Sequence, residues 1–389
     1  MRLEDVCTVF TDGDWIESKD QSEKGIRLVQ TGNIGEGIYL EKESRAKYIP
    51  EDTFKRLKCT EIFPGDILVS RLPEPVGRAC IIPEKTERMI TAVDCTICRP
   101  NEALISKDYL CYFMRSNAYY MRLLGNVTGT TRKRISRKNL GNVELKVPTK
   151  EEQKTVVERL DCLVKVIDSR TKELQLLDDL IKARFIELFG DPVSNSYGLP
   201  EATLSDLGEF GRGVSKHRPR NDIKLLGGKY PLIQTGDVAN AGLYITSYGN
   251  TYSELGLRQS KMWDKGTLCI TIAANIAKTA ILEFDACFPD SVVGFIANER
   301  TNNIFIHYWF SFFQEILESQ APESAQKNIN LKILSELKVI VPEKRKQDEF
   351  ASFVKLTDKS KFQKYNATIL SHNIYMYSKP EGGSYANQL

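Results

Sequence analysis

An α+β protein is the fold class that the sequence predicts, with two similar globular domains joined by long helices. Residues 149–190 form one long helical stretch that contains no proline, and its only glycine is its last residue. The same series of strand and turn motifs stands on both sides of this stretch, about 200 residues apart. Each copy mixes strand-like and helix-like patterns, and 389 residues are enough for two hydrophobic cores.

The long helix carries sequence signals at both ends. A capping box, Thr149 with Glu152, follows Pro148, and Gly190 followed by Pro192 marks the end. Between them, apolar residues alternate at three- and four-residue spacing, slip once and resume, which is typical of a coiled-coil seam. These residues are Val157, Leu160, Val164, Ile167, Leu174, Leu177, Ile181, Phe185 and Leu188.

The length of this helix indicates its use. At about 1.5 Å per residue it would be roughly 55 Å long, which is more than a globular core needs. We therefore expect residues 149–190 to bridge two bodies and to pack against a partner helix. A long surface helix of a single domain is the alternative.

The composition is that of a soluble protein, with 41% hydrophobic and 27% charged residues. No apolar run approaches the roughly 20 residues of a membrane span, and the first residues do not resemble a signal peptide. Nine scattered cysteines favour a reduced state in the cytoplasm. A net charge of +3 is too small to indicate a nucleic-acid partner, so local patches must decide.

The repeat predicts a duplicated domain. Each copy contains a Gln-Thr-Gly-Asn/Asp turn, a turn that feeds a strand, a small basic turn, a helical pattern and a closing basic or amide-rich segment. The matched segments are residues 28–34 with 232–238, 64–70 with 265–271, 76–79 with 276–279, 107–124 with 304–318, and 132–148 with 326–342. The order is therefore globule, helix, globule, helix.

The second helix begins with the same pattern as the first. Residues 151–153 correspond to residues 345–347, and Val156 and Leu160 correspond to Phe350 and Val354. Beyond Val354 the apolar pattern thins. We therefore expect a short second helix over residues 343–370 and a disordered tail over residues 371–389.

The repeated turns are candidate DNA contacts. Gln30 and Thr31 in the first copy, and Gln234 and Thr235 in the second, follow a strand directly. A glutamine amide can hydrogen-bond an adenine edge or a phosphate. The alternative is a structural turn whose side chains cap backbone groups.

Cationic segments are the second set of candidates, because arginine and lysine contact phosphates. One basic segment spans residues 128–138, its amide-rich counterpart spans residues 324–329, and a further basic loop spans residues 216–220. A charge run can also be only a solvated face. The candidate residues are Thr130, Arg132, Lys133, Arg134, Gln326, Lys327, Lys216 and Arg218, together with the repeated cations Arg78 and Lys278.

Catalytic and cofactor motifs are not found. The chain has no nucleotide-binding Gly-x4-Gly-Lys-Ser/Thr loop, no adenine-methyltransferase tetrapeptide and no nucleophilic triad. Cys95 and Cys98 have metal-ligand spacing, but residues 90–98 are predicted to form a strand, where the two sulfurs would point to opposite faces. We therefore expect no catalytic residue, no cofactor and no metal.

Taken together, these motifs resemble the specificity subunit of type I restriction–modification enzymes over about residues 1–365. The resemblance implies that residues 1–148 and 191–342 are target-recognition domains, each reading one half of a split site in double-stranded DNA. It implies that the helices of residues 149–190 and 343–370 pair as an antiparallel coiled-coil spacer. The short distal helix is a departure from the family pattern.

The resemblance also implies partners. Methyltransferase subunits would dock on the helices, and a motor-nuclease subunit would join the complex. These subunits would carry out adenine methylation or ATP-dependent cleavage, because family members have no catalytic centre of their own. Two other classes remain: a duplicated endonuclease or methyltransferase with a divergent active site, and a coiled-coil scaffold that binds only protein.

Overall fold

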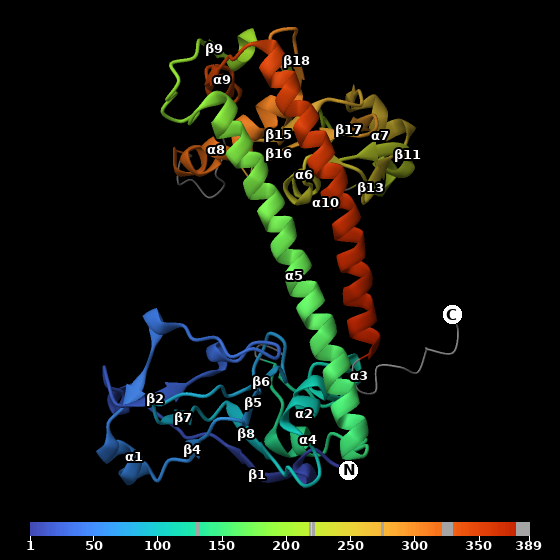
Figure 1. The fold of residues 1–389 in the computed structure, drawn as a ribbon. Coiled ribbons are helices and arrows are strands. Elements are labelled where there is room, and N and C mark those ends of the chain that lie inside the picture. Colours follow the sequence, from blue (N-terminus) through green and yellow to red (C-terminus); the bar gives the residue numbers. More distant parts are fainter. Residues whose placement is uncertain (130–132, 218, 220–221, 274–275, 321–329, 379–389) are drawn as a thin grey trace. The chain divides into compact units, whose positions relative to one another are not determined.

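A computed structural model gives the fold and describes residues 1–129, 133–217, 219, 222–273, 276–320 and 330–378. The chain divides into two compact units, the first made of Met1–Thr171 with the chain from Asn366 onward, and the second of Lys172–Tyr365. Each unit contains one globule of strands and short helices (Figure 1). These globules are called module 1 (residues 1–148) and module 2 (residues 191–342).

Module 1 is built on two four-stranded sheets. The first has neighbouring strands that are all antiparallel, in the order β1 (Cys7–Asp12), β8 (Cys95–Pro100), β5 (Ile67–Ser70) and β6 (Ala79–Ile81). The second has a central parallel pair, in the order β3 (Tyr48–Ile49), β2 (Ile26–Val29), β7 (Met89–Thr91) and β4 (Glu61–Ile62). Buried apolar side chains of β5 and β8 lie on both faces of the first sheet, which places it inside the module.

The helices of module 1 are short. They are α1 (Glu51–Leu57), α2 (Lys107–Phe113), α3 (Asn117–Leu124) and α4 (Arg137–Gly141), with 3-10 turns at Glu4–Val6, Ser18–Asp20, Thr31–Asn33 and Glu43–Arg45. The single helix predicted over residues 107–124 is therefore two helices. Ser116 causes the break, because its side chain accepts a hydrogen bond from Tyr119 N and caps α3.

Module 2 repeats this plan. Its first sheet has the order β10 (Gly208–Arg212), β18 (Val292–Ala297), β15 (Leu268–Thr271), β16 (Thr279–Leu282) and β12 (Tyr244–Ile245). Its second sheet has the order β13 (Asn250–Tyr252), β11 (Leu226–Leu232), β17 (Ala286–Cys287) and β14 (Met262–Trp263), and β19 (Lys338–Ile340) pairs with β9 (Glu201–Thr203). Its helices are α6 (Thr235–Asn240), α7 (Glu254–Arg258), α8 (Asn303–Gln320) and α9 (Leu331–Ser335), with 3-10 turns at Leu204–Asp206 and Ile223–Leu225.

The strands of the two sheets of module 1 have counterparts in the same order in module 2, whose first sheet has β12 in addition. The order β1-β8-β5-β6 corresponds to β10-β18-β15-β16, and β3-β2-β7-β4 corresponds to β13-β11-β17-β14. Both second sheets contain a parallel central pair, β2 with β7 and β11 with β17. The predicted α+β duplication is thereby confirmed.

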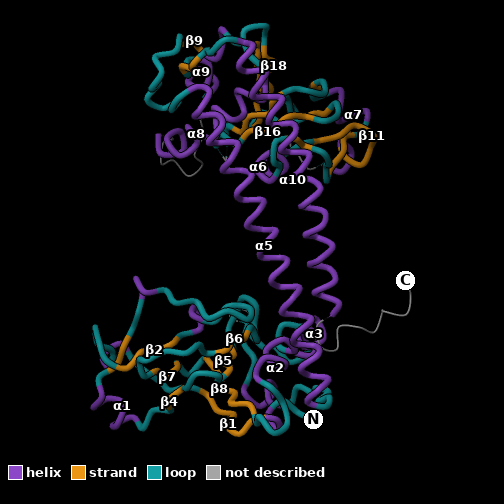
Figure 2. Tube along the Cα trace, viewed as in Figure 1, coloured by secondary structure: helices purple, strands orange, loops and turns teal. Residues whose placement is uncertain are grey.

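Two long helices follow the modules, and Figure 2 shows each of them as an unbroken helix. The first, α5 (Lys150–Phe189), begins after a hydrogen-bonded capping box of Thr149 and Glu152 and ends at Gly190, whose φ is +74°. The second, α10 (Lys344–Ser378), is 35 residues long against 40 for α5.

The predicted short distal helix, ending at residue 370, is therefore wrong, because α10 continues through the first part of the expected tail to Ser378. The apolar pattern thins after Val354, but neither glycine nor proline occurs between Val354 and Pro380, so no helix-breaking residue ends the helix earlier. The remainder of the expected tail, residues 379–389, lies outside the described residues.

Equivalent buried glutamines tie each module to the helix that follows it. The amide of Gln153 donates to the carbonyls of Leu104 and Pro148, both at 2.9 Å, and its oxygen accepts from Ser106 N at 2.8 Å. The Gln347 amide donates to the Arg300 and Pro342 carbonyls at 3.0 and 2.8 Å, and its oxygen accepts from Thr301 at 2.9 Å. Each glutamine, five residues after Pro148 or Pro342, therefore fixes the start of its long helix to the preceding module; these two contacts are called the glutamine locks.

The predicted seam residues pack within their own units. In unit 1, Leu160 is buried against Tyr112, with half-buried Val157, Val164 and Ile167 beside them. In unit 2, the buried seam side chains belong to one aromatic-rich core, and the rings of Phe185 and Phe350 lie 5.3 Å apart. These buried side chains of unit 2 are Ile181, Phe185, Phe189, Phe350 and Val354, while Leu174 and Leu177 are half-buried.

Within unit 2, α5 and α10 run antiparallel. Arg184 contacts Glu349 at 2.6 Å, and Lys361 contacts Asp178 at 2.5 Å, so the numbering rises along one helix as it falls along the other. Two ion pairs therefore flank the apolar contact between these helix segments. The exposed Arg184–Glu349 pair contributes little to stability, whereas the Lys361–Asp178 pair is partly buried, so the aromatic core is the main contact between these segments.

Two further predictions can be compared with the fold. Residues 90–98 form two strands, β7 and β8, rather than one, because a turn at residues 92–94 carries the chain from one sheet to the other. Cys95 and Cys98 lie in different apolar clusters on opposite sides of β8, as predicted. Among the described helices, none is both long and apolar enough to cross a membrane.

Candidate nucleic-acid interface

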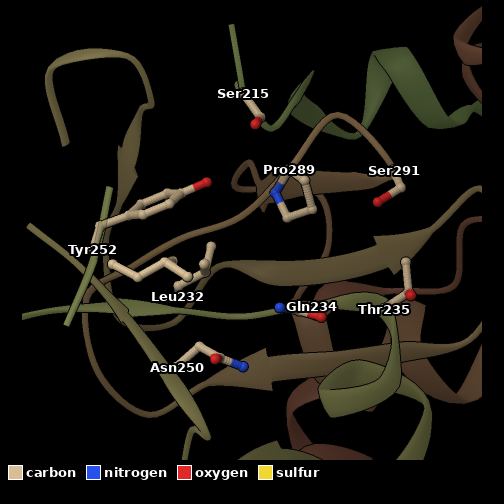
Figure 3. Close-up of a pocket in the computed structure, with 9 residues that line it drawn as sticks. Ser215, Leu232, Gln234, Thr235, Asn250, Tyr252, Pro289 and Ser291 are labelled. Atoms are coloured by element: carbon tan, nitrogen blue, oxygen red, sulfur yellow. The ribbon is translucent and has the colours of Figure 1, made fainter. Parts of the chain in front are cut away.

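A polar cavity in module 2 contains the second Gln-Thr turn. Its volume is about 410 Å³, and Figure 3 shows side chains from several segments pointing into it. Its lining residues are Ser215, Leu226, Leu232, Gln234, Thr235, Asn250, Tyr252, Pro289 and Ser291. None of them is charged, so amides and hydroxyls provide the polar chemistry of this surface.

The turn itself is built by the fourth residue of its motif. The backbone N–H of Gln234 donates to Asp237 at 2.7 Å, and that of Gln30 donates to Asn33 at 3.0 Å. Asn33 is buried and also donates to the Leu40 carbonyl at 2.9 Å. The Asn/Asp position is therefore structural, and the Gln side chain completes the capping box by facing the backbone N–H of the same residue. Gln234 is nevertheless exposed at the cavity, and Thr235 is half-exposed beside it.

Arg78 holds the first turn in place. It is buried, and its guanidinium donates to the carbonyls of Thr31, Ile34, Leu72 and Pro75 at 2.7 to 3.2 Å. Backbone carbonyls thus engage four of the five N–H donors of Arg78, so this residue has a structural role in the turn, and its contact with DNA stays a prediction.

The equivalent cation in module 2 is Lys278. It is half-buried and donates to Gln314 at 3.0 Å. Lys278 is thus also engaged within its module, and the repeated cation has an internal contact in both copies.

The basic segment of module 1 contains a backbone pair of Thr128 and Arg134. These two residues exchange both backbone hydrogen bonds, and Ile135, the next residue, is buried. Lys133 and Arg134 are exposed, and Arg134 pairs with Asp94 at 2.9 Å. The other two predicted contacts here, Thr130 and Arg132, lie outside the described residues.

The basic loop of module 2 lies next to the cavity. Lys216 follows the cavity residue Ser215 directly and is exposed. Gln259 fixes this loop, because its backbone oxygen accepts from Lys216 N at 3.3 Å and its side-chain oxygen accepts from His217 N at 3.0 Å. Predicted contacts Arg218, Gln326 and Lys327 lie outside the described part of the chain.

Sequence reasoning missed most of the cavity. Ser215, Asn250, Tyr252 and Ser291 come from segments that are distant in sequence and join only when β10, β13 and β17 are in place. The one signal that pointed to this region was the repeated Gln-Thr turn.

Burial keeps several ionisable groups elsewhere in the described residues in their neutral form. Burial raises the pKa of Cys95 to about 12 and of Cys111 to about 11, so both thiols stay protonated at neutral pH. Burial lowers the pKa of His307 to about 4, and its ring contacts Thr279 at 2.9 Å. Among the residues that the structure describes, no group of three or more candidate ligands could hold a metal ion.

Two equivalent modules with polar turns and exposed cations, each joined to a long helix, define a duplicated nucleic-acid recognition protein. The model of the type I restriction modification DNA specificity domain matches residues 1–178 and again residues 200–370. This chain therefore belongs to that family, and the resemblance seen in its motifs is confirmed.

Individual proteins agree with this assignment. The chain is 22% identical over 372 residues to a protein of Methanocaldococcus jannaschii described as the type I restriction enzyme MjaX specificity subunit, covering 92% of this chain and 85% of that protein. A solved S subunit of a type I restriction–modification system from M. genitalium has a TM-score of 0.56 at 15% identity, covering 98% of this chain and 96% of that one. A chain solved in work on the assembly and conformational transition of the type I R-M system has a TM-score of 0.60 at 14% identity, with the same coverage.

Proposed function

We propose that this chain recognises a two-part sequence in double-stranded DNA as the specificity subunit of a type I restriction–modification complex. The observation that carries the proposal is the match of strand order in the two modules, each built around a Gln-Thr turn. Since the two modules share one architecture, the same surface of each is available to DNA, and each module reads one half of the target. Exposed cations such as Lys133 and Lys216 supply contacts to phosphates that are independent of sequence.

In this proposal the chain has no catalytic centre, and it acts in the cytoplasm through partners. Methyltransferase subunits carry out adenine methylation, and a motor-nuclease subunit carries out ATP-dependent cleavage. Exposed apolar side chains on the long helices, Leu176, Leu180 and Leu356, support a protein partner there, because their exposed fractions are 56%, 49% and 73%. Since α10 reaches Ser378, the second helix is long enough to take part in docking.

We further infer that α5 and α10 pair over most of their length as an antiparallel spacer. The support comes from unit 2, where residues 178–189 of α5 meet residues 349–361 of α10 in antiparallel order. A rigid helix pair would make the separation of the two half-sites a fixed quantity.

An exchange of modules tests the proposal. Residues Lys172–Tyr365 are replaced by the equivalent segment of another specificity subunit. This segment is longer than module 2 itself, because the core of module 2 includes side chains of α5 and α10 such as Phe185 and Phe350. The hybrid is expressed with its methyltransferase partners, and methylated positions in the genome are sequenced. We expect one half of the target to change and the other to persist. A change in both halves, or in neither, contradicts the one-module-one-half reading.

A further inference from the structure

The module 2 cavity is anchored by rigid, buried side chains. Tyr252 is 2% exposed, Leu232 is 5% exposed and Ser215 is 6% exposed, so its walls are fixed before any ligand arrives. Gln234 and Asn250 are exposed at the same cavity, from the turn after β11 and the start of β13 (Figure 3). A rigid wall with two exposed amides is a preformed recognition surface.

The chemistry of the cavity suits a base edge rather than a phosphate. Phosphate contacts rely mainly on arginine and lysine, and the lining residues include neither. Asparagine and glutamine form paired hydrogen bonds with adenine, serine and threonine bond either kind of edge, and apolar groups contact the thymine methyl. The cavity offers all three kinds of group, with Leu232 and Pro289 as its apolar surface.

A cation stands at the edge of this neutral surface. Lys216 follows Ser215 and is held through its backbone by Gln259, so its side chain is exposed beside the cavity. Phosphate contacts position a protein on the duplex, and base contacts specify the sequence. The loop and the cavity together provide both kinds of contact.

The equivalent positions of module 1 carry different chemistry. The backbone N–H of Gly13 donates to the carbonyl of Cys95, and that of Gly213 donates to the carbonyl of Val292, both at 2.9 Å. Cys95 and Val292 are the first residues of β8 and β18, which pair with β1 and β10. This register makes Trp15, which is 70% exposed, the counterpart of buried Ser215.

The same register also pairs the residues that precede these strands. Cys95 and Val292 occupy equivalent places, opposite Ser70 and Thr271, so Asp94 is the counterpart of Ser291. Asp94 holds Arg134 in an ion pair, whereas Ser291 lines the cavity. Module 1 therefore has an exposed indole and a charged pair where module 2 has buried Ser215 and half-buried Ser291 in the cavity wall.

We propose that the cavity around Gln234 and Asn250 receives the edge of a base pair in duplex DNA and determines part of the half-site read by module 2. The proposal rests on the DNA-recognition function above and names the residues that carry out the reading. Because the corresponding positions of module 1 differ, the two halves of the target differ in sequence.

The test replaces both amides, Gln234→Ala with Asn250→Ala, in the chain expressed with its methyltransferase partners. Methylated sites in the genome are sequenced, and the affinity of the purified complex for a duplex without the target is measured across salt concentrations. At one or two positions of one half-site, we expect the preference for the target base over the other bases to fall about 10- to 100-fold, because a paired hydrogen-bond contact is lost. The other half-site and the salt dependence should stay unchanged, because no charge is removed.

Two controls make the result specific. Gln30→Ala alters the equivalent turn and should affect only the other half-site. Lys216→Ala removes a charge and should weaken binding to all duplexes alike, with a shallower salt dependence. Denaturant unfolding followed through Trp309, which is buried in the core of module 2, shows whether the double variant is folded.

The outcomes separate this proposal from the function on which it rests. If the parent complex writes a two-part methylation pattern and the double variant leaves both halves unchanged, the cavity does not read bases although the chain is a specificity subunit. Relaxation of both halves also overturns the cavity proposal. If the parent complex writes no two-part pattern, the proposed function fails and the cavity proposal fails with it.

Discussion

A four-residue insertion after Thr171 tests whether helix α5 fixes the distance between the two half-sites. Thr171 is exposed and is the last α5 residue of unit 1, and Lys172 begins unit 2. Further along, at Ile181 and Phe185, the helix belongs to the core of module 2, so an insertion there would damage packing as well as length. The exposed position keeps the insertion out of the core of module 2.

The geometry of the helix gives the size of the effect. Four residues add about 6 Å along the axis and rotate the helix beyond the insertion by about 40°, because a turn takes 3.6 residues. B-DNA rises about 3.4 Å per base pair. We therefore expect both half-site sequences to persist while the gap between them grows by one or two base pairs.

The assay is sequencing of methylated sites in cells that express the variant with its partner subunits. The control replaces Thr171 and its exposed neighbour Lys172 by alanine, which keeps the length and should keep the gap. A parent chain that accepts several gap lengths, or an insertion that leaves the gap unchanged, would refute the reasoning. In either case the helix would be a tether and not a spacer of fixed length.

Two further predictions concern the phosphate contacts and the core. Alanine at both Lys133 and Arg134 should weaken binding to every duplex alike, and the loss should shrink as salt rises; unchanged affinity at low salt would reject the contact. Phe185→Ala should lower the stability of module 2 by about 3–5 kcal/mol, because a fully buried ring is removed from an aromatic cluster. Denaturant unfolding followed through buried Trp309 measures this, and Leu176→Ala, at an exposed position, should change stability by less than about 0.5 kcal/mol.

The fold was largely predictable because its signals are local or repeated. The capping box at Thr149 and the glycine at Gly190 lie directly outside the ends of α5, and the repeated turns placed equivalent strands in both modules. The length of α10 was not predictable from an apolar seam, since that seam thins after Val354 while the backbone remains helical to Ser378. The signal for the observed length was the absence of glycine and proline between Val354 and Pro380, which leaves no helix-breaking residue before Ser378.

The site was less predictable because burial decides what a polar residue does. Arg78 lies in a repeated basic turn, as a DNA contact would, yet four carbonyls surround its guanidinium. Ser291 and Tyr252 carry no motif, and only the assembled sheet brings them to Gln234. The sequence identifies the turn, whereas the shape of the cavity depends on contacts between distant segments.

The paired glutamine locks have a consequence for how such a gene can change. Gln153 fastens the start of α5 to module 1, and Phe185 buries the end of α5 in module 2, so the two ends of this helix are inherited with different domains. A recombination event in the codons around Thr171 would keep both sets of contacts intact, because Thr171, Lys172 and Glu173 are all exposed. Crossovers at this position would therefore join unrelated modules into folded hybrids, and new DNA specificities could arise by reassortment without substitutions in either core.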